Sequence, residues 1–369
     1  MSRFRFETAS TADNESLLAF AGQAQMPGPL RLCMDRSPDY FASQQPEGEQ
    51  TQVLLCRAKE TGQVIATGHR AMRTCWVNGA VTKIGFLGGL RIAQPYRGGT
   101  LLCRGYEALK ELHSDGQVAF YLTTILEGNR KALTLLRSGR CRMPHYVDLG
   151  RLICRAIPCK HYRTAHTSDL RVSRASVSDI QPVTEFLQRE GPRHQFFPRL
   201  VQDSAHNGNN LPHDLNWSDF HLAWSGSKLV GIAAAWDQSR FRRWRVTGYA
   251  PWLAMLRPAL NLAASITGRP TLPQPGSSPS CLHLAFACMH ENKPDIFRQL
   301  ISSVLSEAHN IHDYLVASLH ERDPLASVLL KYNGVPLDSR LHAVAWDDGL
   351  AAIHSIDKAL VPHLESGSL

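Results

Sequence analysis

The two halves of this 369-residue sequence repeat the same local patterns in the same order. Residues 9–13 contain Ser-x-x-Asp, and apolar residues follow at intervals of four and three positions. Residues 175–179 begin the same pattern 166 positions later. A strand–turn–strand pattern at 52–66 recurs at 220–231. Their shared order at nearly constant offsets predicts an internal duplication, in which each half of the chain forms the same α+β unit.

The order of the predicted elements is the same in both halves. Each reads as strand, helix, two or three antiparallel strands, and then strand, helix, strand, helix, strand. This order predicts an α+β fold in three layers (α/β/α), with a mixed sheet in each of two tandem domains. We expect a first domain over 1–157, a linker over 158–168 and a second domain over 169–369. The distance along the chain between equivalent residues of the two halves grows to 194 in the later strands. This increase predicts an insertion at about 237–280 in the second domain.

Charge and composition limit the partners. Lysine and arginine total 40 against 32 acidic residues, a net charge of +8 that favours anionic ligands. The charge is spread along the chain, so nucleic acid is not indicated as a partner. The N-terminus lacks the apolar run of a secretory signal, and the nine cysteines include no Cys-x-x-Cys pair. We therefore expect a cytoplasmic protein with free thiols, no metal site and no membrane contact; the sequence does not predict an oligomeric state.

A glycine-rich turn is the most informative segment for function. A strand ends at about Ile92, Pro95 sets a turn, and Arg97-Gly98-Gly99-Thr100 precedes an apolar helix. Glycines at a helix N-terminus let backbone N–H groups approach an anion, and the helix dipole adds to the attraction. An arginine there can add a charge-assisted hydrogen bond to a phosphate. The segment is either a pyrophosphate site or an ordinary strand–turn–helix connection.

The run Leu90-Arg91-Ile92-Ala93-Gln94-Pro95-Tyr96-Arg97-Gly98-Gly99 resembles the acyl-CoA-binding motif of the GNAT acyltransferase superfamily. The order of elements and the duplication are similar to tandem-GNAT proteins. The resemblance implies that acetyl-CoA or another acyl-CoA binds to the first half and that an acyl group passes to an amine of a small molecule or peptide. It also implies roles for seven residues: the pyrophosphate on Arg97, Gly98, Gly99 and Thr100, the CoA arm on Asn129, and oxyanion donors from the backbone around Leu90 and Ile92.

The sequence departs from the family pattern at several positions. Thr100 and Leu102 stand where the later glycines of the motif usually are, and Leu136 stands where the family has a tyrosine acid. The second half has no Arg-Gly-Gly, and Pro294 falls where its helix should begin, so we expect it to keep the fold without a cofactor site. These departures leave two alternatives to an enzyme of this class: a catalytically inactive binding or sensor protein, and a ligase that takes its acyl group from a charged tRNA.

Acylation of an amine needs a base and a proton donor for the leaving thiolate. Glu127 follows a predicted strand and is the first candidate base; a solvated helix-cap carboxylate is the alternative. His69 follows Thr67-Gly68 at a predicted strand edge and is a second candidate, because histidine is a common general acid or base; a structural role is its alternative. Tyr121 and Tyr146 are candidate acids, or packing residues. His290-Glu291 is the local acid–base pair of the second half.

The predicted insertion contains a basic aromatic strip at 240–245 and a helix at 252–267. The alternation of arginine and aromatic residues in this strip is more typical of a half-buried strand than of a nucleic-acid contact. The helix places Trp252, Leu256, Leu260 and Ile266 on one side, which predicts core packing or a lid over an apolar substrate. A membrane-surface helix is less favoured, because the polar side lacks lysines.

Overall fold

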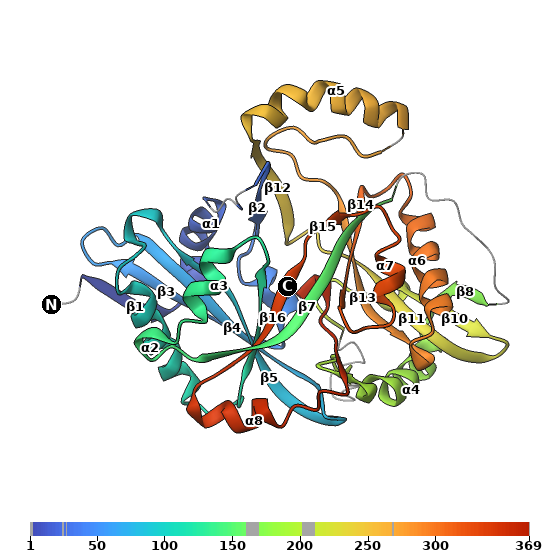
Figure 1. Cartoon of the computed structure of the whole chain (residues 1–369), viewed down its shortest axis with the longest axis horizontal. Helices are drawn as coiled ribbons and strands as arrows, with labels where there is room; N and C mark the ends of the chain where they lie inside the picture. Colours follow the sequence, from blue (N-terminus) through green and yellow to red (C-terminus); the bar gives the residue numbers. More distant parts are fainter. Residues whose placement is uncertain are drawn as a thin grey trace.

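A computed structural model describes residues 3–368 except 24, 25, 27, 160–169, 201–210 and 268. Two halves lie side by side, and one long mixed sheet runs through both (Figure 1). Its strands in the first half are β1 (Phe4–Thr8), β3 (Gln50–Ala58), β4 (Val64–Val77), β5 (Ala80–Ile92), β6 (Tyr121–Leu126) and β7 (His145–Pro158). Those in the second half are β8 (Arg171–Arg174), β10 (Phe220–Ser225), β11 (Lys228–Asp237), β13 (Cys281–Met289), β14 (Tyr314–His320), β15 (Val335–Pro336) and β16 (Ser339–Ala345).

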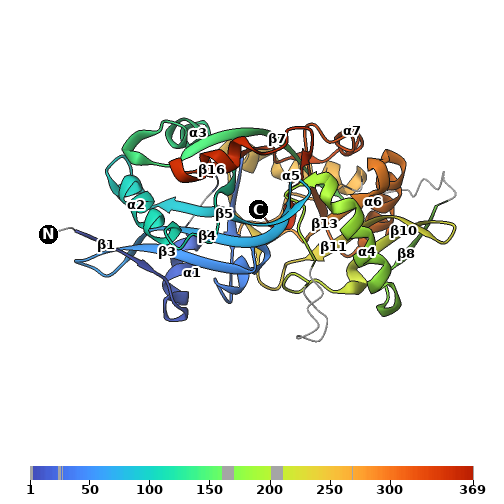
Figure 2. The same cartoon turned by 90° about the horizontal axis from the view of Figure 1, so that it is seen from below.

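Helices cover both faces of this sheet. They are α1 (Asn14–Gly22), α2 (Leu101–His113), α3 (Arg130–Leu136), α4 (Ile180–Glu190), α6 (Pro294–Ala308), α7 (Ala326–Leu329) and α8 (Leu350–His354). Figure 2 shows α1 on one face of the first half and α2 and α3 on the other. Leu17 of α1 packs against Leu55, and Leu101 of α2 packs against Cys56, the neighbouring residue that points to the opposite face. The predicted three-layer α+β fold is confirmed.

The repeated Ser-x-x-Asp pattern acts as a helix start in both halves. Ser10 and Asp13 form a capping box before α1, and Ser176 and Asp179 form the same box before α4. The serine hydroxyl and the aspartate carboxylate satisfy backbone N–H groups that have no partner inside the helix. Four residues in each half are therefore enough to fix where the helix begins.

The centre of the sheet holds an exchange of strands between the halves. β7 and β16 occupy equivalent places, 194 residues apart, and pair with each other in antiparallel fashion. β16 also pairs with β6 of the first half, and β7 pairs with β14 of the second half. The last strand of each half thus completes the sheet of the other. The boundary at 157 stays a prediction, and the proposed linker lies outside the described residues from residue 160 on.

The segment predicted as an insertion joins the first half instead of extending the second. Its strand β12 (Arg243–Tyr249) pairs with β2 (Leu30–Asp35) in a separate two-stranded sheet. Its helix α5 (Pro251–Thr267) stands at the edge of the molecule (Figure 1), and Leu253 is its only buried residue among those described. The predicted strand and helix are present, but core packing of the helix is wrong, because its apolar side chains face solvent. A last small sheet pairs β9 (His194–Gln195) with β17 (Val361–Pro362).

Two further sequence expectations concern thiols and membranes. Seven cysteines of the described part are free, but Cys103 on α2 is disulfide-bonded, so the expectation of free thiols is wrong at that residue. No helix within the described residues is long and apolar enough to cross a bilayer.

Candidate active site

A cavity of about 480 Å³ opens where two strands of the first half separate. β5 and β6 pair in parallel at Gly85–Tyr121 and Phe86–Leu122 and then diverge. Gly88, Gly89, Leu90 and Ile92 of β5 and residues 123–126 of β6 line the gap, and α2 and α3 close it on one face of the sheet. The apolar part of the lining includes Leu54, Cys56, Ala66, Leu101, Leu102, Gly105, Leu109, Ile125, Ala132 and Leu136. Arg36, Glu47, Thr67 and His69 line it as well and make part of the wall polar.

The edge of this cavity is a bulge between β4 and β5. The register of the two strands shifts between Thr67 and His69, and Gly89 has φ +62. A Cβ atom on Gly88 would lie 2.6 Å from His69 Nε2, and one on Gly89 would lie 2.5 Å from His69 Nδ1. Only glycine therefore fits at both positions while the imidazole lies against the bulge.

His69 is buried and bonded through both ring nitrogens. Its Nε2 contacts the Glu47 carboxylate, and its Nδ1 lies 3.1 Å from Gln44 Nε2. Gln44 and Glu47 therefore hold the imidazole from both sides. Both ring nitrogens have protein partners, so neither is free to act on a molecule in the cavity. His69 instead fixes the position of the bulge.

Glu47 lies at the centre of a buried charge cluster made of Arg36, Glu47, His69 and Arg242. Burial by itself would raise the pKa of Glu47, but His69, Arg36 and Arg242 together bring it down to about 2. Arg242 belongs to the insertion of the second half; its Nη1 lies 3.3 Å from Glu47 Oε1, and it also donates to Gln238 Oε1. Burial lowers the pKa of Arg242 to about 10, which still leaves it charged at neutral pH. The site wall thus depends on both halves.

The predicted phosphate loop adjoins the cavity at the start of α2. Thr100 is the N-cap residue of the helix, Gly98 has φ +82, and the loop is exposed. Arg97 donates from Nε to the Ile92 carbonyl at 2.9 Å, which ties the loop to the end of β5. Leu90 and Ile92 line the cavity; Arg97, Gly98, Gly99 and Thr100 do not, but they directly precede Leu101, which does.

Asn129 lies on the α3 side of the same cavity. Its Oδ1 accepts from the backbone N–H of Ala132 at 3.3 Å, so it caps α3. Of the seven predicted cofactor residues, Asn129, Leu90 and Ile92 therefore line the cavity, and the other four precede the lining residue Leu101 along the chain.

Two of the predicted catalytic residues, Glu127 and Tyr121, lie outside this cavity. The carboxylate of Glu127 pairs with Arg151 at 3.2 Å. Tyr121 is fully buried, and its hydroxyl lies 3.3 Å from Arg70 Nη1 and 3.0 Å from His113 Nδ1. The structure does not bring either side chain together with His69, and neither lines the cavity.

A pair of tyrosines lies in the cavity instead. The hydroxyls of Tyr106 on α2 and Tyr146 on β7 are 2.5 Å apart, and both side chains line the wall beside Leu136. Burial raises the pKa of Tyr106 to about 12 and raises that of Tyr146 well above its ordinary value. Sequence analysis proposed Tyr146 and missed Tyr106, although Tyr106 lies four residues from Leu102 and three from Leu109, on the inner side of the predicted helix.

The equivalent gap of the second half is filled by the chain itself. β13 and β14 pair over 281–283 and 314–316, and Phe286 has φ +50 beyond the last pair. The Phe286 N–H donates to the Glu365 carboxylate at 2.9 and 3.0 Å, and Ser366 Oγ bonds the carbonyls of Leu284 and Val316. Residues 363–368 thus occupy the place that is hollow in the first half. His290 pairs with Glu190 at 2.9 Å, and neither His290 nor Glu291 lines the first-half cavity.

Comparisons with solved structures identify the fold of the chain. No protein-family model and no curated protein matches the sequence. The chain is similar in structure to Saccharomyces cerevisiae N-myristoyltransferase with bound myristoyl-CoA, at 12% identity over 93% of this chain and 83% of that chain, with a TM-score of 0.58. It is also similar to a GCN5-related glucosamine N-acetyltransferase region of a fungal multi-domain beta-N-acetylglucosaminidase, at 11% identity over 93% of this chain and 38% of that chain, with a TM-score of 0.60. The chain is therefore a protein of the GNAT fold whose two halves repeat the same order of elements.

Proposed function

We propose that this protein is an acyl-CoA-dependent acyltransferase whose first half binds the acyl-CoA and whose acceptor is an amine of a small molecule or peptide. The observation that carries the proposal is the cavity between β5 and β6. Its wall is largely apolar and includes Leu101 in the first turn of α2, the helix that Arg97, Gly98 and Gly99 precede. An apolar wall suits an acyl chain, and backbone N–H groups with an arginine suit a pyrophosphate.

Acyl transfer forms a C–N bond to the thioester carbon and breaks the C–S bond; the nitrogen loses a proton and the sulfur gains one. We assign the backbone N–H groups of the β5 bulge, between Gly88 and Ile92, to the carbonyl oxygen as it becomes negative. His69 is a positioning residue that holds this bulge. The Tyr106–Tyr146 pair is the proton source for the leaving sulfur, because phenols with raised pKa values stay protonated at neutral pH.

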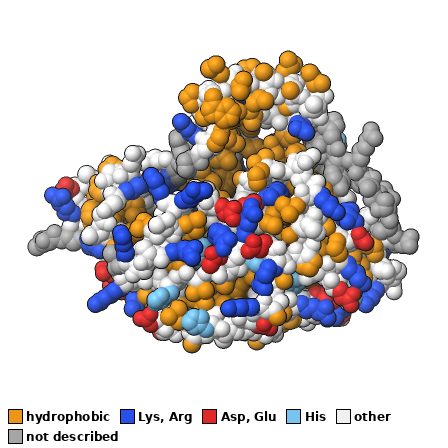
Figure 3. All heavy atoms as spheres, in the orientation of Figure 1, with side chains coloured by type: hydrophobic (Ala, Val, Ile, Leu, Met, Phe, Trp, Pro, Cys, Tyr) orange, Lys and Arg blue, Asp and Glu red, His pale blue; other side chains and the backbone are white. Residues whose placement is uncertain are grey.

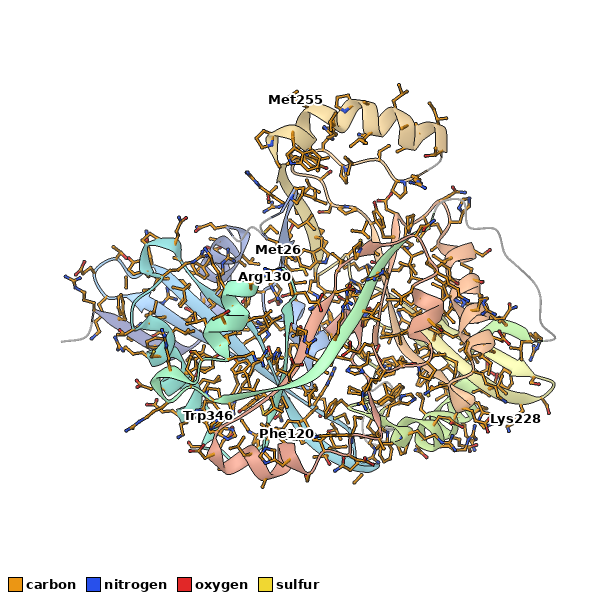
Figure 4. The ribbon with its side chains drawn as sticks, viewed as in Figure 1. Met26, Phe120, Arg130, Lys228, Met255 and Trp346 are labelled. Atoms are coloured by element: carbon orange, nitrogen blue, oxygen red, sulfur yellow. The ribbon has the colours of Figure 1, made fainter. Side chains whose placement is uncertain are left out.

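Reversing the charge of the loop tests the cofactor part of the proposal. We expect the wild type to be stabilised by acetyl-CoA, or by a longer acyl-CoA, by about 2.7 kcal/mol at a concentration near 100 times the dissociation constant. Arg97→Glu should lose this shift in thermal unfolding, because a carboxylate would repel the pyrophosphate. Lys228→Glu is the matched control: it makes the same charge change at the exposed start of β11 in the second half (Figure 4). If no acyl-CoA stabilises the wild type, the proposal fails.

Removing a tyrosine hydroxyl tests the catalytic part. Tyr146→Phe should lower kcat by about 100-fold with little change in acyl-CoA affinity, since general acids contribute about that much or more. The measurement is release of free CoA thiol in the presence of an amine panel. Tyr121→Phe serves as the control, because its hydroxyl lies outside the cavity and should leave turnover close to that of the wild type.

The second candidate function is a catalytically inactive binding or sensor protein. One observation in support is Leu136 in the cavity wall, where the family has a tyrosine acid. The other is that both nitrogens of His69 have protein partners. Among the described residues that line the cavity, no imidazole or carboxylate is therefore left free to act as a base. This function predicts acyl-CoA binding that Arg97→Glu abolishes, with no thiol release from any amine and no effect of Tyr146→Phe.

A further inference from the structure

Helix α5 presents its apolar side to solvent and its polar side to the protein. Trp252, Met255, Leu256, Leu260, Leu262 and Ile266 recur at spacings of one to four along the helix and form one continuous side. Their exposed fractions run from 43% to 82%. Met255 lies on the outer side of the helix, away from the rest of the molecule (Figure 4). A surface helix of a globular protein has the opposite arrangement, with its apolar side toward the core.

The inward orientation of the polar side is fixed by hydrogen bonds. Asn261 donates from Nδ2 to the Leu272 carbonyl at 3.1 Å and accepts from the Leu272 N–H at 2.7 Å. Arg257 donates from Nε to the same carbonyl at 3.1 Å. Rotating the helix to bury its apolar side would break all three bonds. These hydrogen bonds therefore keep the apolar side of α5, which we call the apolar ridge, exposed in the folded protein. Large exposed apolar patches mark interaction surfaces.

The chain around this ridge is cationic. Residues 238–280 contain six arginines and no aspartate or glutamate. Arg269 follows the end of α5 and is exposed, and Arg31, also exposed, pairs with Gly248 just before the helix begins. Figure 3 shows apolar side chains gathered on α5, with basic side chains below it on both sides. A surface that meets this one should combine an apolar interior with negative charge.

We propose that α5 docks onto an anionic lipid surface, with its apolar ridge between the acyl chains and Arg31 and Arg269 against the headgroups. A convex ridge that protrudes from the molecule can enter a planar interface without a matching groove. A second copy of the chain fits less well, because it would bring two cationic segments without acidic residues against each other. This inference replaces the sequence-based expectation of no membrane contact, and it does not depend on the acyltransferase proposal.

Vesicle sedimentation tests this docking on the full-length protein. We expect binding to vesicles of phosphatidylcholine mixed with phosphatidylglycerol and little binding to phosphatidylcholine alone. Met255→Asp combined with Ile266→Asp should abolish binding, because both charges would enter the apolar layer. Arg31→Gln and Arg269→Gln should each weaken binding about fivefold and reduce its sensitivity to salt.

Val177→Asp is the matched control, since Val177 is as exposed as Met255 but lies in the second half before α4. It should bind vesicles as the wild type does. Equal binding to both kinds of vesicle, or none to either, would overturn the proposal. So would a dimer in sedimentation equilibrium that the Met255→Asp variant dissociates, which would assign the ridge to a second copy.

Discussion

Replacing Gly105 with leucine is expected to weaken acyl-CoA binding about 100-fold without loss of folding. Gly105 lies on α2 and lines the cavity, and a Cβ atom there would make an ordinary contact of 3.6 Å with Phe6. A leucine side chain must then extend into the cavity, and fitting extra groups into filled space costs about 1–3 kcal/mol. The helix itself gains up to about 1 kcal/mol when glycine is replaced. Titration calorimetry with acyl-CoA measures the affinity, and thermal unfolding without ligand measures the stability.

Gly105→Ala is the control, because it shows whether the filled cavity volume or the loss of the glycine itself weakens acyl-CoA binding. It removes the glycine but adds only the one carbon that the site accommodates, so its affinity should stay near that of the wild type. Undiminished binding by the leucine variant would place the ligand elsewhere and would remove the cavity from the proposed function.

Glu47→Gln should destabilise the folded protein by about 3–5 kcal/mol, the largest loss of stability that we expect from any single conservative change in this chain. The substitution leaves Arg242 and His69 buried without their anion, and breaking a buried ion pair from one side costs about this much. Urea unfolding followed by circular dichroism gives the difference. Glu49→Gln is the control two residues away: it makes the same chemical change on an exposed side chain and should cost less than about 1 kcal/mol.

The Glu47 carboxylate should also make the free energy of unfolding depend on pH in the acid range. Its pKa is about 2 in the folded protein against an ordinary value of 4.5, so the folded state holds the proton less tightly than the unfolded state. Its contribution, about 3 kcal/mol, is fully present above about pH 5 and is lost as the pH falls from there toward 2. The wild type should therefore lose stability over this range more steeply than Glu47→Gln. Parallel pH profiles of the two proteins would contradict the assignment.

Local signals predict the order of elements well. The capping pairs Ser10–Asp13 and Ser176–Asp179, the hairpin turns and the glycines before α2 act over a few residues, so the sequence itself contains the whole interaction. The repeat then extends each local assignment to the other half. The α+β order of elements follows from these patterns. The GNAT fold is suggested by the resemblance of residues 90–99 to a family motif, and the structural neighbours and the mixed sheet confirm it.

The candidate site is predicted less completely, because its wall is formed by distant segments. Tyr121 and Thr123 point to the same face of β6, but only Thr123 lines the cavity, because β5 leaves β6 after the Phe86–Leu122 pair. Glu47 and Arg242 are 195 residues apart, and no sequence pattern joins them. Tyr106 has a helical spacing that places it on the inner side of α2, but nothing local joins it to Tyr146.

The amino-acid order alone thus decides where each helix and strand begins and that one unit occurs twice, since short-range hydrogen bonds and apolar periodicity settle those features. Three other features are decided only when the chain is packed: the exchange of β7 and β16, the meeting of Arg242 with Glu47, and the outward turn of α5. Each depends on which of several competing long-range partners buries most surface and satisfies most polar groups, and no pattern in a single segment encodes that choice.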